Sequence, residues 1–326
     1  MKKVLAMMMA LALLLCSFAG MAMAEEETKT IAGLVHCENQ WAAMLMAGME
    51  AAASEYGFEF VSSNYNSDAV REAELVNTYI TQGVSGIIAS PSQTAASVYR
   101  QAVDQGIPVA VVNGSLDNND FSVCFVRYSN YDLGKAAAEG TVDYITEQLD
   151  GKPVWHRFFY SPGTDCDQRG NAAIDVYTEA FGEEYGQPIS ESSTKDSAQA
   201  MQQVTDALTA NPDINLIFCE NEDQYNGARA AILSLGLQDS VICAAVDCSV
   251  AMCEHLLDPE DNILQSAGAQ NSYDMGYIGC KYLCETILGT RTDYEPGAEE
   301  LLEVPALNKN DLEAVQEFYD MLLSFE

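Results

Sequence analysis

Basic residues are scarce in this chain of 326 residues, which holds 15 Lys and Arg against 49 Asp and Glu. The formal net charge is −34 at pH 7. Proteins bind nucleic acids mainly through Lys and Arg that neutralise phosphates, so this balance argues against a nucleic-acid partner and against an anionic lipid surface. The acidic residues are spread along the chain, and we expect them to form a solvated surface.

Catalytic signatures are also missing from the sequence. The chain contains no Gly-x-Gly-x-x-Gly turn, no P-loop, no His-Glu-x-x-His and no Gly-x-Ser-x-Gly. Only three histidines occur, and we interpret His36, His156 and His255 as structural residues. A cysteine-rich segment at 243–255 has a spacing that matches no zinc pattern. The sequence therefore predicts no enzyme, no cofactor and no metal site.

Only one long apolar run exists, and it lies at the N-terminus. Two lysines precede an apolar stretch at 4–20, and Ala22-Met23-Ala24 supplies a small-x-small cleavage pattern. Residues 1–24 therefore have the pattern of a secretory signal peptide, which predicts an exported protein, in the periplasm or on the extracellular face of the membrane. Cys16 could carry a lipid, but no small residue precedes it, so a lipid anchor is the less favoured alternative.

Nine cysteines remain after the predicted signal, and an odd number cannot all form disulfides within one chain. Several stand inside apolar runs, as Cys219 and Cys243 do, where a free thiol behaves as a small buried apolar group. We expect most of them to fill the core as free thiols, with one or two disulfides as the alternative.

Short apolar runs alternate with longer amphipathic stretches from residue 29 onward, which is the pattern of βα units around parallel sheets. We expect strands at 30–36, 58–62, 86–89, 108–112, 121–126, 154–160, 214–219, 241–246, 263–267 and 301–304. We expect helices at 41–56, 69–81, 95–105, 131–149, 198–210, 227–235 and 275–288. The predicted fold class is α/β with two Rossmann-like lobes, each a mainly parallel sheet flanked by helices. No flexible linker separates them, so bare crossovers of the chain would form a hinge.

Polar side chains follow the carboxyl ends of the predicted strands, which is where open α/β sheets bind ligands. The candidates are Asn39, Trp41, Asn113, Asp165, Arg169, Asn221, Asp247 and Gln270. Amide, carboxylate and guanidinium groups can satisfy adjacent hydroxyls, and an indole can lie against the C–H face of a ring. The set therefore suits a neutral polyhydroxy ligand. For the Asn and Asp residues, helix capping or turn formation is the competing interpretation.

The candidates stand within a colinear series of short motifs that covers the chain after the signal. The motifs are TIAGLV at 30–35 with NQW at 39–41, GVSGIIASP at 83–91, GIPVAVVN at 106–113, DCDQR at 165–169, DSAQA at 196–200, NPD at 211–213, FCEN at 218–221, AVD at 245–247, and Gln270 with MG at 275–276. In this order they resemble the periplasmic or extracellular solute-binding proteins of sugar ABC transporters, of the ribose and galactose type. The resemblance implies a type I periplasmic binding protein fold whose lobes close on a sugar.

The resemblance also implies lobe boundaries, partners and site roles. Residues 25–129 and 271–302 would form the N-terminal lobe, and 130–270 and 303–326 the C-terminal lobe, with a hinge of three crossovers near Ser129, Gln270 and Leu302. The expected ligand is a sugar or polyol and the expected partner is an ABC transporter permease, with the protein a monomer. A sensory protein that presents its ligand to a chemoreceptor or a histidine kinase uses the same fold and is the alternative.

Lys195 departs from the family pattern, because relatives usually place an aromatic residue at this position. The sequence therefore offers no second aromatic side chain at that position to stack on the sugar from the side opposite Trp41. Lys195 is either an exposed loop residue or an ammonium that enters the site, where it could favour an acidic sugar or contact a hydroxyl. Asn113 with the Asp165-x-x-x-Arg169 motif resembles the hexose-binding branch more than the pentose-binding branch. The short segment 149–152 offers no calcium loop of the kind some relatives have.

Overall fold

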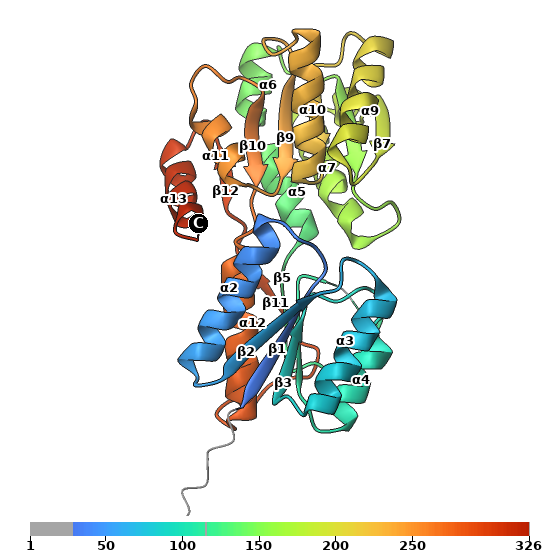
Figure 1. Ribbon diagram of the computed structural model, residues 1–326. Coiled ribbons are helices and arrows are strands. Elements are labelled where there is room, and N and C mark those ends of the chain that lie inside the picture. The colour runs from blue at the N-terminus through green and yellow to red at the C-terminus, as the bar shows by residue number, and fades with distance from the viewer. Residues whose placement is uncertain (1–28, 115, 326) are drawn as a thin grey trace, which may run out of the picture.

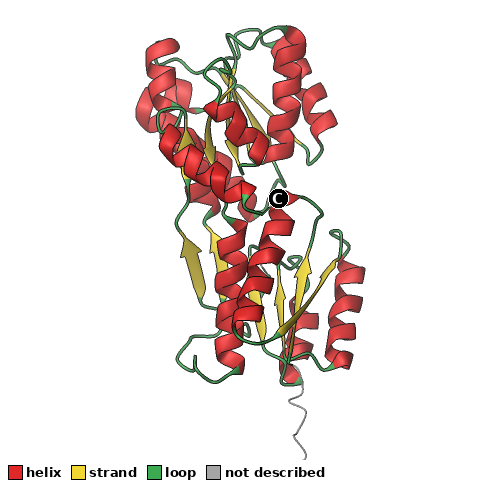
Figure 2. Cartoon of the chain, turned by 60° about the vertical axis from the view of Figure 1, so that its left-hand side comes forward, coloured by secondary structure: helices red, strands yellow, loops and turns green. Residues whose placement is uncertain are grey.

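The computed structural model describes residues 29–114 and 116–325, and it has two α/β lobes, one above the other (Figure 1). The predicted signal peptide, 1–24, and Cys16 within it lie outside the described residues. Each lobe contains one six-stranded sheet with helices packed against it (Figure 2). The predicted fold class, α/β with two mainly parallel sheets flanked by helices, is confirmed.

The N-terminal lobe has a sheet in which every pair of neighbouring strands is parallel, in the order β11-β5-β4-β3-β1-β2. Helices α2 and α12 cover one face and α3 and α4 cover the other (Figure 1). Because both faces are covered, β3 and β4 are wholly buried and apolar throughout. The elements are β1 Thr30–Val35, α2 Gln40–Glu55, β2 Glu59–Asn64, α3 Ala69–Gln82, β3 Gly86–Ala89, α4 Ala96–Asp104, β4 Val109–Val112, β5 Phe125–Tyr128, α12 Ser272–Ile287 and β11 Glu299–Leu302.

The C-terminal lobe has the strand order β12-β10-β9-β8-β6-β7, parallel except for the antiparallel edge strand β12. Helices α5, α6 and α7 pack on one face, and α9, α10, α11 and α13 on the other. The elements are α5 Asn130–Glu139, α6 Val142–Gln148, β6 Trp155–Phe159, the 3-10 turn Asp165–Asp167, α7 Gln168–Phe181, α8 Glu183–Gly186, β7 Ser190–Ser193, α9 Ser197–Ala210, β8 Leu216–Cys219, α10 Glu222–Leu235, β9 Ile242–Val246, α11 Val250–Leu257, β10 Leu264–Gly268, β12 Ala306–Asn308 and α13 Leu312–Leu323.

The chain passes between the two lobes at three places within the described residues: after β5, after β10 and after β11. β5 and β10 are parallel strands that leave their sheets at the carboxyl end and lead directly into the other lobe. The carboxyl edge of each sheet therefore faces the opposite lobe. Two of the crossovers are tied together, because the Tyr128 hydroxyl accepts from the Asn271 N–H (3.1 Å) and donates to the Asn271 carbonyl (3.3 Å).

Several element boundaries differ from those expected. The helix expected at 131–149 is divided into α5 and α6 at Gly140, where a Cβ would lie 2.4 Å from Ser266 Oγ. The strand expected at 121–126 lies instead at 125–128. The expected elements also omit helices α7, α8, α11 and α13 and the edge strands β7 and β12. The sequence of β7, Ser-Glu-Ser-Ser, has no apolar alternation.

The cysteines behave as the sequence predicts. All nine cysteines of the described chain are free thiols, and all except Cys37 and Cys166 are buried. Cys248 and Cys253 have their sulfur atoms 3.4 Å apart, which is a contact between thiols and not a bond. The interpretation of most cysteines as core residues is confirmed.

Candidate functional site

A series of hydrogen bonds runs along the carboxyl edge of the C-terminal sheet and links predicted site residues. Arg169, at the start of α7, donates from Nη1 to the carbonyl oxygen of Glu220 (2.5 Å), the residue before Asn221. The backbone N–H that follows Asn221 donates to Asp247 Oδ2 (3.4 Å). Gln270, on the crossover after β10, donates from Nε2 to Asp247 Oδ1 (2.6 Å). The structure therefore brings these predicted residues together on one edge.

Asn113 and Asp247 hold a left-handed backbone conformation that residues other than glycine rarely adopt. Asn113 follows β4 directly with φ 58°, and Asp247 follows β9 directly with φ 75°. Both residues stand at the carboxyl end of an inner strand, one in each lobe. Backbone strain of this kind costs about 1 to 3 kcal/mol and persists where the surrounding structure imposes it. This conformation distinguishes Asn113 and Asp247 from the residues that directly follow the other strands facing the opposite lobe.

Asn39 and Asn221 are helix caps. Asn39 Oδ1 accepts from the Ala42 N–H (3.0 Å) at the start of α2, and Asn221 Oδ1 accepts from the Gln224 N–H (3.1 Å) at the start of α10. The competing interpretation from the sequence, helix capping, therefore applies to both residues. Neither Nδ2 amide takes part in a hydrogen bond within the described chain, so capping still leaves each residue one donor group for a ligand.

A buried ion pair that no sequence pattern predicts lies beneath this edge. Arg157 on β6 is 3% exposed and Glu220 is fully buried, with Arg157 Nη2 3.2 Å from Glu220 Oε1. Glu220 Oε2 accepts from the backbone N–H of Tyr160 (2.8 Å). Burial raises the pKa of Glu220, while the Tyr160 N–H and the two nearby guanidinium groups oppose that shift. The pair fixes the backbone that leaves β6.

Asp165 lies beside the hinge and contacts the other lobe. Its Oδ2 forms an ion pair with Arg127 on β5 and accepts from Asn130 Nδ2 (2.9 Å), while Arg127 also contacts Glu299 on β11. Burial alone would raise the pKa of Asp165, but the bonds from Asn130 and Arg127 hold it below its usual value. The carboxylate of Asp165 is therefore already committed to a bridge between the lobes.

Trp41 and His36 form an aromatic pair at the carboxyl edge of the N-terminal sheet. Trp41 is half-buried in the first turn of α2, and its Nε1 is buried without a hydrogen-bond partner in the described chain. The two ring centroids are 5.4 Å apart. The sequence analysis placed His36 inside a strand, but β1 ends at Val35, so His36 stands at this edge and contacts Ser90 Oγ through Nδ1 (3.1 Å). Sequence reasoning missed His36 as a site residue.

Charged groups of the C-terminal lobe act on residues of the N-terminal lobe. Burial, followed by the charge of Lys195, lowers the pKa of His36. Burial, followed by the charges of Asp247 and Asp223, raises the pKa of Cys37 to about 11. His36 and Cys37 belong to the N-terminal lobe, while the three charged groups belong to the C-terminal lobe, so the two carboxyl edges face each other at short range. Asp223 is a further residue that the sequence analysis did not select.

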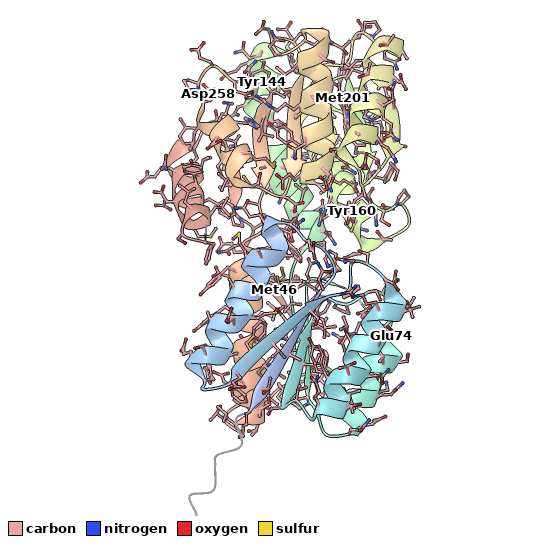
Figure 3. The ribbon with its side chains drawn as sticks, viewed as in Figure 1. Met46, Glu74, Tyr144, Tyr160, Met201 and Asp258 are labelled. Carbon is pink, nitrogen blue, oxygen red and sulfur yellow. The ribbon has the colours of Figure 1, made fainter. Side chains whose placement is uncertain are left out.

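Lys195 lies against an aromatic ring. Its side chain is exposed, and Nζ is 4.5 Å from the centroid of the Tyr160 ring. Tyr160 follows β6 and lies at the level where the two lobes meet (Figure 3). Burial raises the pKa of Tyr160 to about 12, with smaller effects from Cys166, Arg169, Asp247 and Cys37. Tyr160 was expected to lie within a strand at 154–160 and was not among the predicted site residues, but β6 ends at Phe159.

An open hollow of about 350 Å³ lies beside the site on the N-terminal lobe, between the start of α2 and the end of β2. Cys37, Asn39 and Met46 line it together with residues 62–64, and no residue of the C-terminal lobe takes part. Of the predicted site residues, only Asn39 lines this hollow. We therefore take the facing edges, and not this hollow, as the candidate site.

Two further properties bear on the function. Among residues 29–114 and 116–325, no group of three or more His, Cys, Asp or Glu is arranged to hold a metal ion. In the same residues, no helix is long and apolar enough to cross a membrane.

Comparison with known proteins identifies the family. The sequence profile described as "Periplasmic binding protein domain" matches residues 34–291, which is most of the chain and includes elements of both lobes. The chain belongs to the periplasmic binding protein family. The resemblance drawn from the sequence motifs is confirmed.

Relatives of this periplasmic binding protein include both a regulator and a transport protein. The HTH-type transcriptional regulator IdnR of Escherichia coli (strain K12) is 29% identical over 194 residues, 59% of this chain and 55% of the regulator. The ribose import binding protein RbsB of Bacillus subtilis (strain 168) is 23% identical over 208 residues, 63% of this chain and 65% of that protein. The chain thus spans less than two thirds of the length of either relative.

A solved structure extends the comparison to almost the whole periplasmic binding protein. An ABC transporter solute-binding protein from Bacillus halodurans C-125 with bound myo-inositol has a TM-score of 0.76 and 19% sequence identity. The match covers 91% of this chain and 99% of that one. At this identity the likeness establishes the fold, and the ligand has to be argued from the residues of this chain.

Proposed function

We propose that the protein binds a sugar or a related polyhydroxy solute between its two lobes and delivers it to an ABC transporter permease. The observation that carries this proposal is the meeting of two sets of hydrogen-bonding groups at the facing carboxyl edges. Asp247, Gln270 and Arg169 come from the linked series on one edge, and Asn113 and Trp41 come from the other. Family membership and the bound myo-inositol of the similar structure support the same ligand class.

The proposed ligand contacts follow from the hydrogen-bond donors and acceptors that these side chains have left over after their bonds within the protein. Arg169 uses Nε to bond Asn130 Oδ1 (2.8 Å) and Nη1 to bond a carbonyl, which directs its remaining nitrogen to the ligand. The Asp247 carboxylate accepts two hydrogen bonds within the protein, and it can accept further ones from a ligand because a carboxylate has about four acceptor sites. Asn39 and Asn221 would donate through their Nδ2 amides. Trp41 would pack against the C–H face of the sugar ring.

Binding would be coupled to closure of the lobes. We propose lobes of 25–129 with 271–302 and of 130–270 with 303–326, which rotate about the crossovers near Ser129, Gln270 and Leu302. A ligand that contacts both lobes binds the closed state more tightly and so shifts the population toward it. Asp165 acts in this cycle through its ion pair with Arg127, next to the first crossover.

The site holds charges of both signs, which bears on the kind of sugar. Lys195 carries an ammonium that pairs with no carboxylate in the described chain, and it could contact the acidic group of a sugar acid. Asp247 and Asp223 provide carboxylates close to Cys37 on the opposite edge, and these favour ligand groups that donate hydrogen bonds. The hydroxyls of a neutral sugar or polyol can accept from the Lys195 ammonium and donate to the two carboxylates. A sugar acid is the second ligand class to test.

The wider role would be that of an exported, monomeric binding protein without enzymatic activity. The predicted signal peptide at 1–24 supports export, and the matched family is named for periplasmic proteins. A sensory role, in which the loaded protein contacts a chemoreceptor or a histidine kinase, uses the same cleft. Pull-down with the loaded protein as bait distinguishes the two roles, because transport predicts a permease and sensing predicts a receptor.

A thermal-shift panel tests the ligand class directly. The panel holds myo-inositol, D-allose and D-ribose as cyclic sugars or polyols, allitol and xylitol as open-chain polyols, D-gluconate as a sugar acid, and adenosine as a nucleoside. A compound that binds only the folded state raises its stability by mass action, by about 2.7 kcal/mol at one hundred times its Kd. We expect at least one sugar or polyol to raise the unfolding temperature. A panel in which none does so contradicts the proposed function.

Calorimetry with an Asp247→Ala variant then tests the site. Hydrogen bonds to a charged group contribute about 1.5 to 3 kcal/mol, which corresponds to a loss of affinity of about 10- to 150-fold. The matched control is Asp239→Ala, an exposed aspartate in the turn before β9, at the opposite end of the strand from Asp247. Equal binding by the parent and the Asp247 variant would show that the ligand binds elsewhere.

A further inference from the structure

We propose that the open hollow on the N-terminal lobe is a second subsite, which holds a neutral sugar ring attached to the sugar or polyol between the lobes. The inference rests on the proposed function and deepens it, because it makes a glycoside the preferred ligand. The volume of the hollow, about 350 Å³, lies within the range of about 300 to 1,000 Å³ that is usual for small-molecule sites. Asn39 lines the hollow and is also one of the predicted site residues, so a ligand of two rings can contact both places.

The hollow lies at the carboxyl edge of the N-terminal sheet, which is the edge that faces the other lobe. β1 and β2 are parallel neighbours in which Val35 pairs with Asn64. The lining segments 37–39 and 62–64 therefore stand at the carboxyl ends of these two strands. The start of α2 completes the hollow, and this end of the helix lies next to the C-terminal lobe (Figure 1). A substituent on a ligand between the lobes thus reaches the hollow by extending along the edge of one lobe.

One wall of the hollow is apolar and comes from α2. Ala42, Ala43 and Met46 line it, and their spacing of three and four residues places them on one face of the helix. Asn39, the N-cap of α2, stands at the end of this stripe, three residues before Ala42. Figure 3 shows Met46 on α2, below the level where the two lobes meet. Apolar side chains of this kind gain free energy when they cover the C–H groups of a sugar ring.

The facing wall is polar and comes from β2. Ser62 and Asn64 are two positions apart on this strand, so their side chains share one face of the sheet. Ser63 points to the other face, where its Oγ accepts from the Tyr79 hydroxyl (2.7 Å). Asn64 Oδ1 accepts from the Asn66 N–H (2.7 Å), and Asn64 Nδ2 is buried without a hydrogen-bond partner in the described chain. Buried polar groups are normally hydrogen-bonded, and a hydroxyl of a second ring would supply the acceptor that this amide lacks.

The charge of the lining indicates a neutral substituent. Among the described residues that line the hollow, Glu38 is the charged one, and its carboxylate repels anions. A phosphate or carboxylate on the substituent would therefore find no cation there. An alkyl chain would use the apolar wall but leave Ser62 and Asn64 without partners. A sugar ring offers a C–H face to one wall and hydroxyls to the other, so a neutral disaccharide or other O-glycoside fits both.

The position of the hollow has a consequence for closure of the lobes. All described residues that line it belong to the N-terminal lobe, so its shape stays the same when the lobes rotate as rigid bodies. A ring bound there adds the same affinity to the open and the closed state. Contacts that are equal in two states do not shift the population between them. The second ring should therefore tighten binding without changing the degree of closure.

The experiment measures Kd by calorimetry for three single-ring compounds, D-glucose, D-galactose and myo-inositol, and for four glycosides that contain them. The glycosides are cellobiose, maltose, melibiose and galactinol, a galactoside of myo-inositol. The proteins are the parent, Ala43→Phe, Ser62→Phe and the control Ser54→Phe. Ala43 and Ser62 are exposed lining residues on opposite walls, so phenylalanine at either position fills the hollow. Ser54 is also exposed on α2, about 16 Å along the helix from Ala43.

We expect at least one glycoside to bind the parent about tenfold or more tightly than the single-ring compounds that it contains. Ala43→Phe and Ser62→Phe should each remove most of this gain, while they change the Kd of the single-ring compounds by less than about twofold. Ser54→Phe should bind both kinds of ligand like the parent. Small-angle scattering of the parent should give the same radius of gyration at saturation with the glycoside and with the single-ring compound.

The outcomes separate this inference from the proposed function. If the parent binds no compound of this set or of the thermal-shift panel, the proposed function fails and the subsite fails with it. If the parent binds a sugar or polyol but no glycoside more tightly, only the subsite is overturned. The subsite is also overturned if the filling variants bind the glycoside like the parent, or if they weaken both kinds of ligand equally.

A larger radius of gyration with the glycoside would likewise overturn the subsite, because the second ring would then lie between the lobes and hold them apart. Unfolding temperatures without ligand show whether each variant is folded. The two filling substitutions lie on different elements, α2 and β2, so the test stays valid if one of the two variants does not fold.

Discussion

Acid should destabilise the C-terminal lobe through one buried histidine, His156. This residue on β6 is 2% exposed, and its two ring nitrogens contact Ser190 Oγ and Ser192 Oγ on β7, both at 2.8 Å. Burial lowers the pKa of His156 from 6.5 to about 4. The folded protein thus binds the proton more weakly than the unfolded chain does. The stability that His156 contributes is fully present above about pH 6.5 and is lost as the pH falls toward about 4.

Linkage gives the size of this effect. With pKa values of about 4 when folded and 6.5 when unfolded, protonation of His156 should lower the free energy of unfolding by about 2 kcal/mol between pH 7 and pH 5. The buried carboxylates Glu72 and Glu220 act in the opposite direction, because burial raises their pKa values and their charged forms become costly as the pH rises. A comparison of two proteins that differ only at His156 cancels these contributions.

The assay is urea unfolding of a parent and a His156→Gln variant at both pH values. Glutamine can still bond the serines but does not titrate. Both proteins carry Trp41→Phe, so that fluorescence reports Trp155, which is fully buried next to His156 and in edge contact with Tyr177 and Phe218. We expect the parent to lose about 2 kcal/mol more than the variant on going to pH 5. Equal losses in the two proteins would refute the role assigned to His156.

Three further predictions concern packing and closure. Gly134→Ala should destabilise the protein by about 1 to 3 kcal/mol and weaken ligand binding, because the new Cβ would lie 1.9 Å from the Arg169 carbonyl oxygen. Thermal unfolding measures the loss of stability. The control is Lys135→Ala at the exposed neighbouring position, which should have little effect. In a Trp155→Phe background, emission from Trp41 should change when a ligand from the panel binds, and an unchanged spectrum at saturation would place Trp41 away from the ligand. Small-angle scattering should report a smaller radius of gyration on binding, and a constant radius despite confirmed binding would place the ligand in one lobe.

The sequence predicted the fold well wherever burial leaves a periodic signal. Strands covered on both faces, such as β3 and β9, are apolar throughout and were predicted to within a residue. The edge strand β7 is polar and pairs on one side only, so no alternation marks it. The helix expected at 131–149 divides at Gly140 because of a contact with Ser266, which is distant in sequence. Such a contact leaves no local signal.

Candidate site residues could be selected from the sequence where a residue type is unusual for its place, as at Asp247 directly after a buried strand. Two residues were missed because of boundary errors of a single position. The strand expected at 30–36 ends at Val35, and the strand expected at 154–160 ends at Phe159. The last residue of each expected strand, His36 and Tyr160, therefore lies at the facing edge. The partners of Arg157 and Arg127 could not be predicted either, because these ion pairs join segments that are far apart in the chain.

The three crossovers have a consequence for the order in which the molecule can assemble during synthesis. The N-terminal sheet needs β11, and its helical layer needs α12, which packs against α2. Both segments leave the ribosome after every parallel strand of the C-terminal lobe has been made. The lobe that is begun first is therefore completed only after most of the other lobe has been made, and its contacts join residues separated by more than two hundred positions, as in the bond from Tyr277 to Glu55. Non-local contacts slow folding, so the nascent chain would stay unfolded for longer than a chain with consecutive domains, a state suited to the export proposed above.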